Sequence, residues 1–206
     1  MDQTAAMILI IFSVLCLLLH IGLMVYWHWT NKKTVPWFGR DDIDSHLNVL
    51  EISDVTVFLI NKNSFSPFAK RINMDTRKGF TLYSVTSFLH ECGHALQEKD
   101  DSGLTRIRTF TYAMQLLGTI GILASTIVYS YPIHNAVFFI GILIVIHYAV
   151  TVMNEWDANK KARKQISILP FSPKERIQCM ILTHSYTLSY MNLLTLFAIC
   201  FILFLL

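Results

Sequence analysis

The sequence predicts a mainly α-helical integral membrane protein, with about four transmembrane helices and a small cytoplasmic domain that is mostly helical and has a minor β element. Hydrophobic residues make up 53% of the 206 residues and charged residues only 15%, whereas a soluble domain carries about a quarter charged residues. Residues 3–31, 109–154 and 177–206 contain no Asp, Glu, Lys or Arg. All 17 Lys and Arg lie in the two polar segments between these stretches.

The charge-free stretches predict the membrane helices. Residues 5–27 form a nearly continuous apolar run, longer than the roughly 20 residues that cross a bilayer as a helix. Basic residues follow this run rather than precede it, so we expect a retained anchor and not a cleaved signal peptide. The middle stretch has room for two crossings, residues 112–131 and 133–153, on either side of the turn-like Ser130-Tyr131-Pro132. Residues 187–206 supply the fourth helix.

The polar segments, residues 28–111 and 154–182, are predicted to lie on one side of the membrane because two crossings separate them. Their basic residues place that side in the cytoplasm by the positive-inside rule. We therefore expect a single multi-pass domain, residues 1–206, in the cell membrane, with the lipid bilayer as a partner. No basic stripe with interleaved aromatic residues occurs, so no nucleic-acid partner is expected.

Three elements are predicted within the polar segments. Residues 83–98 carry apolar side chains at helical spacing and should form a partly buried helix. Residues 69–74 alternate weakly and are a strand candidate. The third membrane helix should continue past residue 153 through Lys164, since no Pro or Gly intervenes before Pro170.

The most informative residues are His90-Glu91-Cys92-Gly93-His94, an HExxH motif on the predicted helix. Histidines four residues apart share one helical face and can bind the same metal ion, and the intervening glutamate can act as a general base. One catalytic Zn²⁺ fits this pattern, because such an ion takes three protein ligands and leaves one position for water. The motif therefore predicts a small zincin-like domain with Glu91 as the catalytic residue.

The third ligand must come from a distant part of the sequence. The extended pattern HExxHxxGxxH is absent, because Gln97 and Asp100 stand where it needs glycine and histidine. Glu155 is favoured over Asp157 by its position just past the third membrane helix. Weaker candidates are His46, His147 and His184.

The segments HECGHALQ, residues 90–97, and NEWDANKKA, residues 154–162, resemble the paired motifs of the neutral zinc metallopeptidase family, the YugP-like membrane zinc peptidases. The likeness runs from about Ser53 onward and is specific at the two motifs. More distantly, the chain is similar to CAAX-prenyl and HtpX-type membrane peptidases. The resemblance implies that His90, His94 and Glu155 bind zinc and that Glu91 is the catalytic acid and base.

The chain departs from the family pattern at three positions. Cys92 replaces a small aliphatic residue, and Trp156 replaces the common Phe. Asn159 stands where gluzincin peptidases often have an Asp that orients a zinc-bound histidine, although its amide oxygen could still accept a hydrogen bond. Cys92 lies off the histidine face and is expected to be a packed thiol rather than a ligand.

These observations favour a membrane-embedded zinc metallopeptidase that acts on a peptide or a membrane protein. One alternative is a catalytically inactive relative that serves as a membrane scaffold or binds a partner. A zinc transporter or sensor is the other alternative, but it would need ionisable groups along several spans, and only His20, His134 and His147 occur there.

Overall fold

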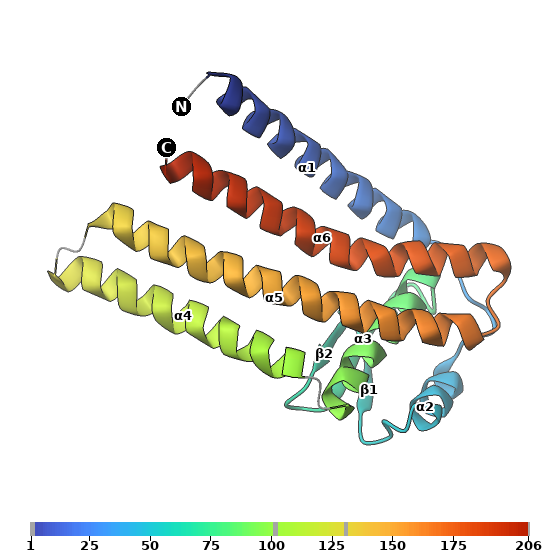
Figure 1. Cartoon of the computed structure of the whole chain (residues 1–206). Helices are drawn as coiled ribbons and strands as arrows, with labels where there is room; N and C mark the ends of the chain where they lie inside the picture. The colour runs from blue at the N-terminus through green and yellow to red at the C-terminus, as the bar shows by residue number, and fades with distance from the viewer. Residues whose placement is uncertain (1–2, 101–102, 130–131, 206) are drawn as a thin grey trace. The chain divides into compact units, whose positions relative to one another are not determined.

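The computed structural model describes residues 3–100, 103–129 and 132–205, and within them the chain is mainly helical (Figure 1). The helices are α1 (Gln3–Thr30), α2 (Arg40–Val49), α3 (Leu82–Lys99), α4 (Gly103–Tyr129), α5 (Ile133–Ile168) and α6 (Pro173–Leu205). The strands are β1 (Thr56–Ile60), β2 (Ser64–Ser66) and β3 (Arg71–Asp75). The predicted helical class with a minor β element is confirmed, and its cytoplasmic placement stays a prediction.

Four helices in the described part of the chain, α1, α4, α5 and α6, are long and apolar enough to cross a membrane. With 36 and 33 residues, α5 and α6 are about 50 Å long, well beyond a hydrocarbon core of about 30 Å. Each of these two helices is therefore long enough to contain both an apolar stretch that could cross the membrane and a polar extension beyond it. The predicted continuation of the third membrane helix past residue 153 is confirmed by α5. The stretch expected to cross the membrane from residue 187 lies within α6, which begins at Pro173.

The chain divides into two compact units, to both of which α1, α5 and α6 contribute. The apolar unit comprises Met1–Gly22, Gly103–Asn154 and Leu188–Leu206, and the polar unit comprises Leu23–Ser102 and Glu155–Thr187. The single membrane domain and its segment bounds stay predictions. Of the expected turn before the third membrane helix, Ser130 and Tyr131 lie outside the described residues.

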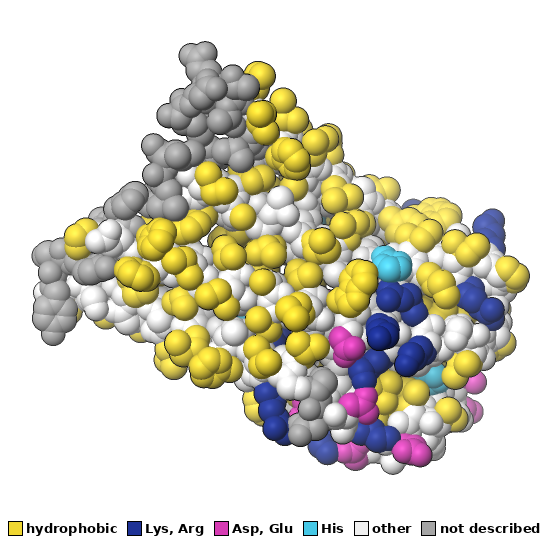
Figure 2. All heavy atoms as spheres, in the orientation of Figure 1, with side chains coloured by type: hydrophobic (Ala, Val, Ile, Leu, Met, Phe, Trp, Pro, Cys, Tyr) yellow, Lys and Arg dark blue, Asp and Glu magenta, His cyan; other side chains and the backbone are white. Residues whose placement is uncertain are grey.

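Within the apolar unit, hydrophobic side chains cover much of the face seen in Figure 2, and polar groups contact one another between helices. Arg108 Nη1 donates a hydrogen bond to Asn154 Oδ1 over 2.9 Å. The Nδ2 group of Asn192 donates to the Cys16 carbonyl oxygen over 2.8 Å. These contacts satisfy groups that would be costly to expose to hydrocarbon.

The polar unit contains a three-stranded sheet in the order β1-β3-β2. Strand β3 pairs in parallel with β1 and antiparallel with β2. Alternate β3 residues, Ile72 and Met74, are fully buried in the core that the sheet shares with α3. The strand expected at residues 69–74 corresponds to β3 to within two residues, whereas the sequence analysis did not predict β2.

Helix α3 is fixed at its start and along its buried face. Thr81 is the N-cap, and its hydroxyl accepts a hydrogen bond from the Ser84 backbone N–H. Phe88 and Leu89 are fully buried in the core of the polar unit. The helix predicted at residues 83–98 is therefore confirmed, with bounds at Leu82 and Lys99.

Gly93 permits α3 to approach α5 closely. A Cβ atom at this position would overlap the carbonyl oxygen of Ala158 and lie 3.0 Å from its carbonyl carbon. Ala158 and Ala162 on α5 are themselves fully buried. The small residues on both helices therefore allow nearly direct backbone contact at the crossing.

We expect Gly93→Ala to lower the free energy of unfolding by about 1–3 kcal/mol, because the added methyl group forces α3 and α5 apart. Gly121→Ala is the control, since that helical glycine has open space around its Cα and alanine should stabilise the helix by about 0.5–1 kcal/mol. Circular dichroism during unfolding in detergent measures both changes. Equal stability of the two variants would contradict the close crossing.

Candidate metal centre

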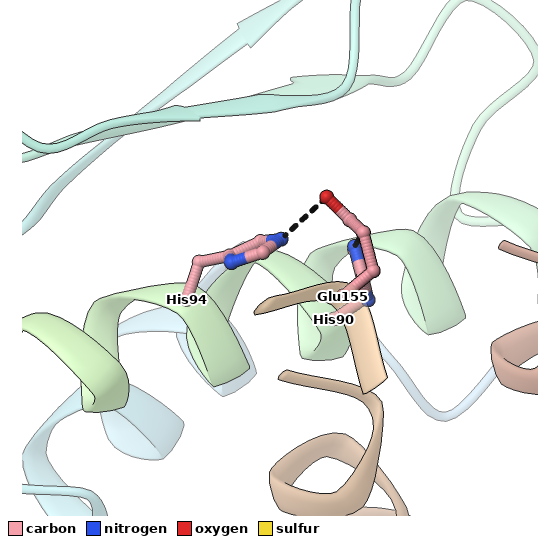
Figure 3. A group of neighbouring side chains, drawn as sticks. All are labelled: His90, His94 and Glu155. Carbon is pink, nitrogen blue, oxygen red and sulfur yellow. Dashed lines mark ion pairs between the residues drawn. The ribbon is translucent and has the colours of Figure 1, made fainter. Parts of the chain in front are cut away.

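Three buried side chains with metal-binding atoms converge in the polar unit (Figure 3). His90 and His94 project from α3, and Glu155 projects from α5. His90 Nε2 lies 3.2 Å from Glu155 Oε2, and His94 Nε2 lies 3.5 Å from Glu155 Oε1. The residues are only 6%, 9% and 3% exposed. Each imidazole therefore faces a different oxygen of one carboxylate.

This group fits a zinc ion. Ligand atoms at about 2.0–2.2 Å from a tetrahedral ion lie about 3.3–3.5 Å apart, close to the nitrogen–oxygen distances found here. Two imidazoles and one carboxylate are a donor set of catalytic zinc sites. A buried carboxylate also requires positive charge nearby, which a divalent cation would supply. The predicted residues His90, His94 and Glu155 are thus brought together, and metal binding by them stays a prediction.

Asn159 orients the imidazole of His90. Its Oδ1 atom lies 2.7 Å from His90 Nδ1, and its Nδ2 group donates to Thr187 Oγ1 over 2.6 Å. Because the amide nitrogen is engaged by Thr187, the amide oxygen faces the imidazole and accepts its Nδ1–H. The lone pair of His90 is thereby placed on Nε2, the atom that faces Glu155. The expectation that Asn159 could serve in place of an aspartate is met by this geometry.

Gln97 orients the second imidazole in the same way. Gln97 Oε1 lies 2.8 Å from His94 Nδ1, and Gln97 Nε2 donates to Asp157 Oδ2 over 2.9 Å. Gln97 is fully buried, so this contact is shielded from solvent. Asp157, the competing candidate for third ligand, therefore interacts with Gln97 and is not in the group of three ligand atoms.

Tyr186 lies beside His90 and contacts Ser87, which also interacts with Tyr83, and the sequence analysis did not identify these three residues as neighbours of the site. The ring centroid of Tyr186 is 4.7 Å from that of His90, and its hydroxyl is 2.6 Å from Ser87 Oγ. Burial raises the pKa of Tyr83, the charges of Asp75 and Glu91 raise it further, and hydrogen bonds with Ser87 and Asn63 lower it. Tyr83, Ser87 and Glu91 follow one another at four-residue spacing, a signal that could have linked them.

Glu91, the predicted catalytic residue, is half-buried and lies outside the group of three ligand atoms. Burial raises the pKa of the neighbouring Cys92 thiol well above its usual value, and the charge of Glu91 adds to this effect. The Cys92 side chain belongs to the hydrophobic core, as expected for a packed thiol.

The weaker ligand candidates have other partners. His46 Nε2 lies 2.8 Å from Gln165 Oε1, and burial lowers the pKa of His46 while this hydrogen bond opposes the shift. His147 belongs to the apolar unit, where its Nδ1 lies 3.2 Å from Thr111 Oγ1. The ring of His184 lies against Trp156, with centroids 6.2 Å apart. None of the three is in the ligand group found among the described residues.

Fold and site together define a mainly helical protein with membrane-compatible helices and a buried His-His-Glu group suited to a divalent metal ion. The model of the family described as "Putative neutral zinc metallopeptidase" matches residues 5–179. The chain belongs to this family, as its paired motifs indicated. Searches of curated proteins and of solved structures give no match.

We expect Asn159→Ala to weaken zinc binding by about 10–100-fold, because His90 loses the acceptor that fixes its ring and tautomer. Gln165→Ala is a matched control: it also removes a buried α5 amide from a histidine, but that histidine is His46. Competition with a zinc-specific chelator measures both affinities. Equal losses in the two variants would show that Asn159 acts through general stability alone.

Glu155→Gln and Asp157→Asn should separate the two candidates for third ligand. We expect Glu155→Gln to lose zinc on gel filtration, because an amide cannot replace the buried carboxylate. Asp157→Asn should keep close to one ion per chain, since its carboxylate contacts Gln97. Elemental analysis of the purified variants measures this, and the reverse pattern would assign the site to Asp157.

Proposed function

We propose that the chain is a membrane-embedded, zinc-dependent metallopeptidase that hydrolyses peptide bonds, with Glu91 as general base and general acid. The observation that carries this proposal is the buried group His90, His94 and Glu155, with Glu91 adjoining His90 on α3. Membership of the metallopeptidase family supports it. Four membrane-compatible helices support the placement in a bilayer.

His90, His94 and Glu155 would hold a single Zn²⁺ through two nitrogens and a carboxylate. When bound, the ion would supply Lewis acidity, lowering the pKa of a water molecule and polarising the peptide carbonyl. Asn159 and Gln97 keep the two imidazoles oriented through their Nδ1–H groups. Fixed ligands of this kind need little rearrangement during the reaction.

Glu91 would handle the proton. Its carboxylate takes a proton from the attacking water and then gives it to the amine that leaves the cleaved peptide bond. Glu91 is only half-buried, so part of its side chain is accessible to a substrate. Tyr83 keeps its phenolic proton, since its pKa is raised, and so remains a hydrogen-bond donor near Glu91.

The substrate class follows only in broad terms. A peptide or a membrane protein near the bilayer is the proposed substrate, and the cytoplasmic side of the cell membrane is the proposed location of the site. The confinement of all 17 Lys and Arg to two polar segments supports this orientation.

We expect Glu91→Gln to retain zinc but to lose hydrolysis by about 10²–10⁴-fold, because the amide cannot accept the proton. Glu98→Gln is the control: it removes the same charge from an exposed position on the same helix. Comparative proteomics of cells that carry the wild type or each variant identifies cleavage products that depend on Glu91.

Two outcomes of this experiment would overturn the proposal. Full hydrolysis by Glu91→Gln would remove Glu91 from the mechanism. Identical proteomes in the wild type and Glu91→Gln, together with a zinc-free purified wild type, would favour the catalytically inactive membrane scaffold.

A further inference from the structure

Basic and apolar side chains that are not part of the His90, His94 and Glu155 group form a surface on α5 and α6 in the polar unit. Three α5 cations, Lys160, Arg163 and Lys164, follow Trp156 at spacings of four, seven and eight residues, which places them on one helical face. On α6, Ile181 and His184 are exposed at helical spacing. We call this surface the basic face: Trp156, Lys160, Arg163, Lys164, Ile181 and His184.

The cations of the basic face have no carboxylate partner among the described residues. Neighbouring basic residues of the polar unit differ in this respect. Lys161 pairs with Asp100, and Lys99 Nζ lies 2.9 Å from Glu51 Oε2. Positive charge on the basic face is therefore available to an external anion.

The guanidinium of Arg163 contacts both the imidazole of His184 and the ring of Trp156. Arg163 Nη1 lies 3.4 Å from both ring nitrogens of His184. The guanidinium carbon of Arg163 lies 5.8 Å from the Trp156 ring centroid, within reach of a cation–π contact. The contact with His184 links α5 to α6, and the two contacts together restrict the position of Arg163.

Apolar side chains adjoin the cations. Trp156 and Ile181 are 52% and 48% exposed. Figure 2 shows Lys and Arg side chains gathered beside hydrophobic ones, with a histidine among them. A surface with both characters matches the boundary of a bilayer, where acyl chains meet charged headgroups and Trp is enriched.

We propose that the basic face binds the phosphate headgroup of an anionic phospholipid. The lysines and Arg163 would contact the phosphate, and Trp156 and Ile181 would contact the glycerol and upper acyl chains. A lipid is favoured over a soluble anion because α5 and α6 are themselves long and apolar enough to cross a membrane. Along α5, Trp156 comes two residues after the apolar unit ends at Asn154.

The test compares lipid binding by the full chain in detergent, using native mass spectrometry with phosphatidylglycerol and phosphatidylcholine of identical acyl chains. The test variant combines Lys160→Gln, Arg163→Gln and Lys164→Gln. The control variant combines Arg40→Gln, Lys62→Gln and Lys78→Gln, three exposed cations elsewhere in the polar unit, so the loss of charge is the same. Zinc content and circular dichroism report whether each variant is folded.

We expect the wild type and the control variant to bind phosphatidylglycerol at least about tenfold more tightly than phosphatidylcholine. The test variant should lose this preference while keeping its zinc and its circular dichroism spectrum. Equal preference in the test and control variants would overturn the proposal. Displacement of the lipid by inorganic phosphate at the same concentration would overturn the assignment to a lipid. Because zinc binding is read separately, this result does not depend on peptidase activity.

Discussion

The close crossing of α3 and α5 is the constraint on which the candidate metal centre depends. Gly93 lies between the two histidines of the motif and meets the backbone of Ala158, three residues after Glu155. The distances of 3.2 and 3.5 Å between imidazole nitrogens and carboxylate oxygens exist only while the two helices are this close. A larger residue in place of Gly93 would move the histidines away from Glu155, so the geometry of the candidate metal centre depends on this glycine.

Burial then determines what must surround these ligands. A carboxylate and two imidazoles that are shielded from water need hydrogen bonds or a cation to offset the loss of hydration. Asn159 and Gln97 satisfy the Nδ1–H groups, and their own amide nitrogens donate to Thr187 and Asp157. In both histidines an amide oxygen therefore accepts the Nδ1–H, and the Nε2 atom faces Glu155.

The long helices α5 and α6 run from the apolar unit into the polar unit. At about 50 Å, α5 and α6 exceed the apolar core of a bilayer and carry both apolar stretches and residues of the polar unit. Glu155 and the cations of the basic face therefore belong to the same helix as a membrane-compatible segment. This arrangement explains why half of the chain is free of charge while the remainder is rich in charged residues.

Local features of the sequence determined the helical class. Continuous charge-free stretches predicted the apolar helices, and helical periodicity predicted the shared face of His90 and His94. The likeness to gluzincin peptidases, and not periodicity, marked Asn159 as a hydrogen-bond acceptor for a histidine. The sequence left Glu155 and Asp157 as alternatives for the third ligand. Side chains two positions apart on a helix point about 200° apart, and only the packing of α5 against α3 shows which of the two faces the histidines. Tertiary structure directed Glu155 to the histidines and Asp157 to Gln97, and it brought Tyr186 to Ser87 across 99 residues. Such contacts depend on how separate helices pack, and no local sequence pattern records that packing.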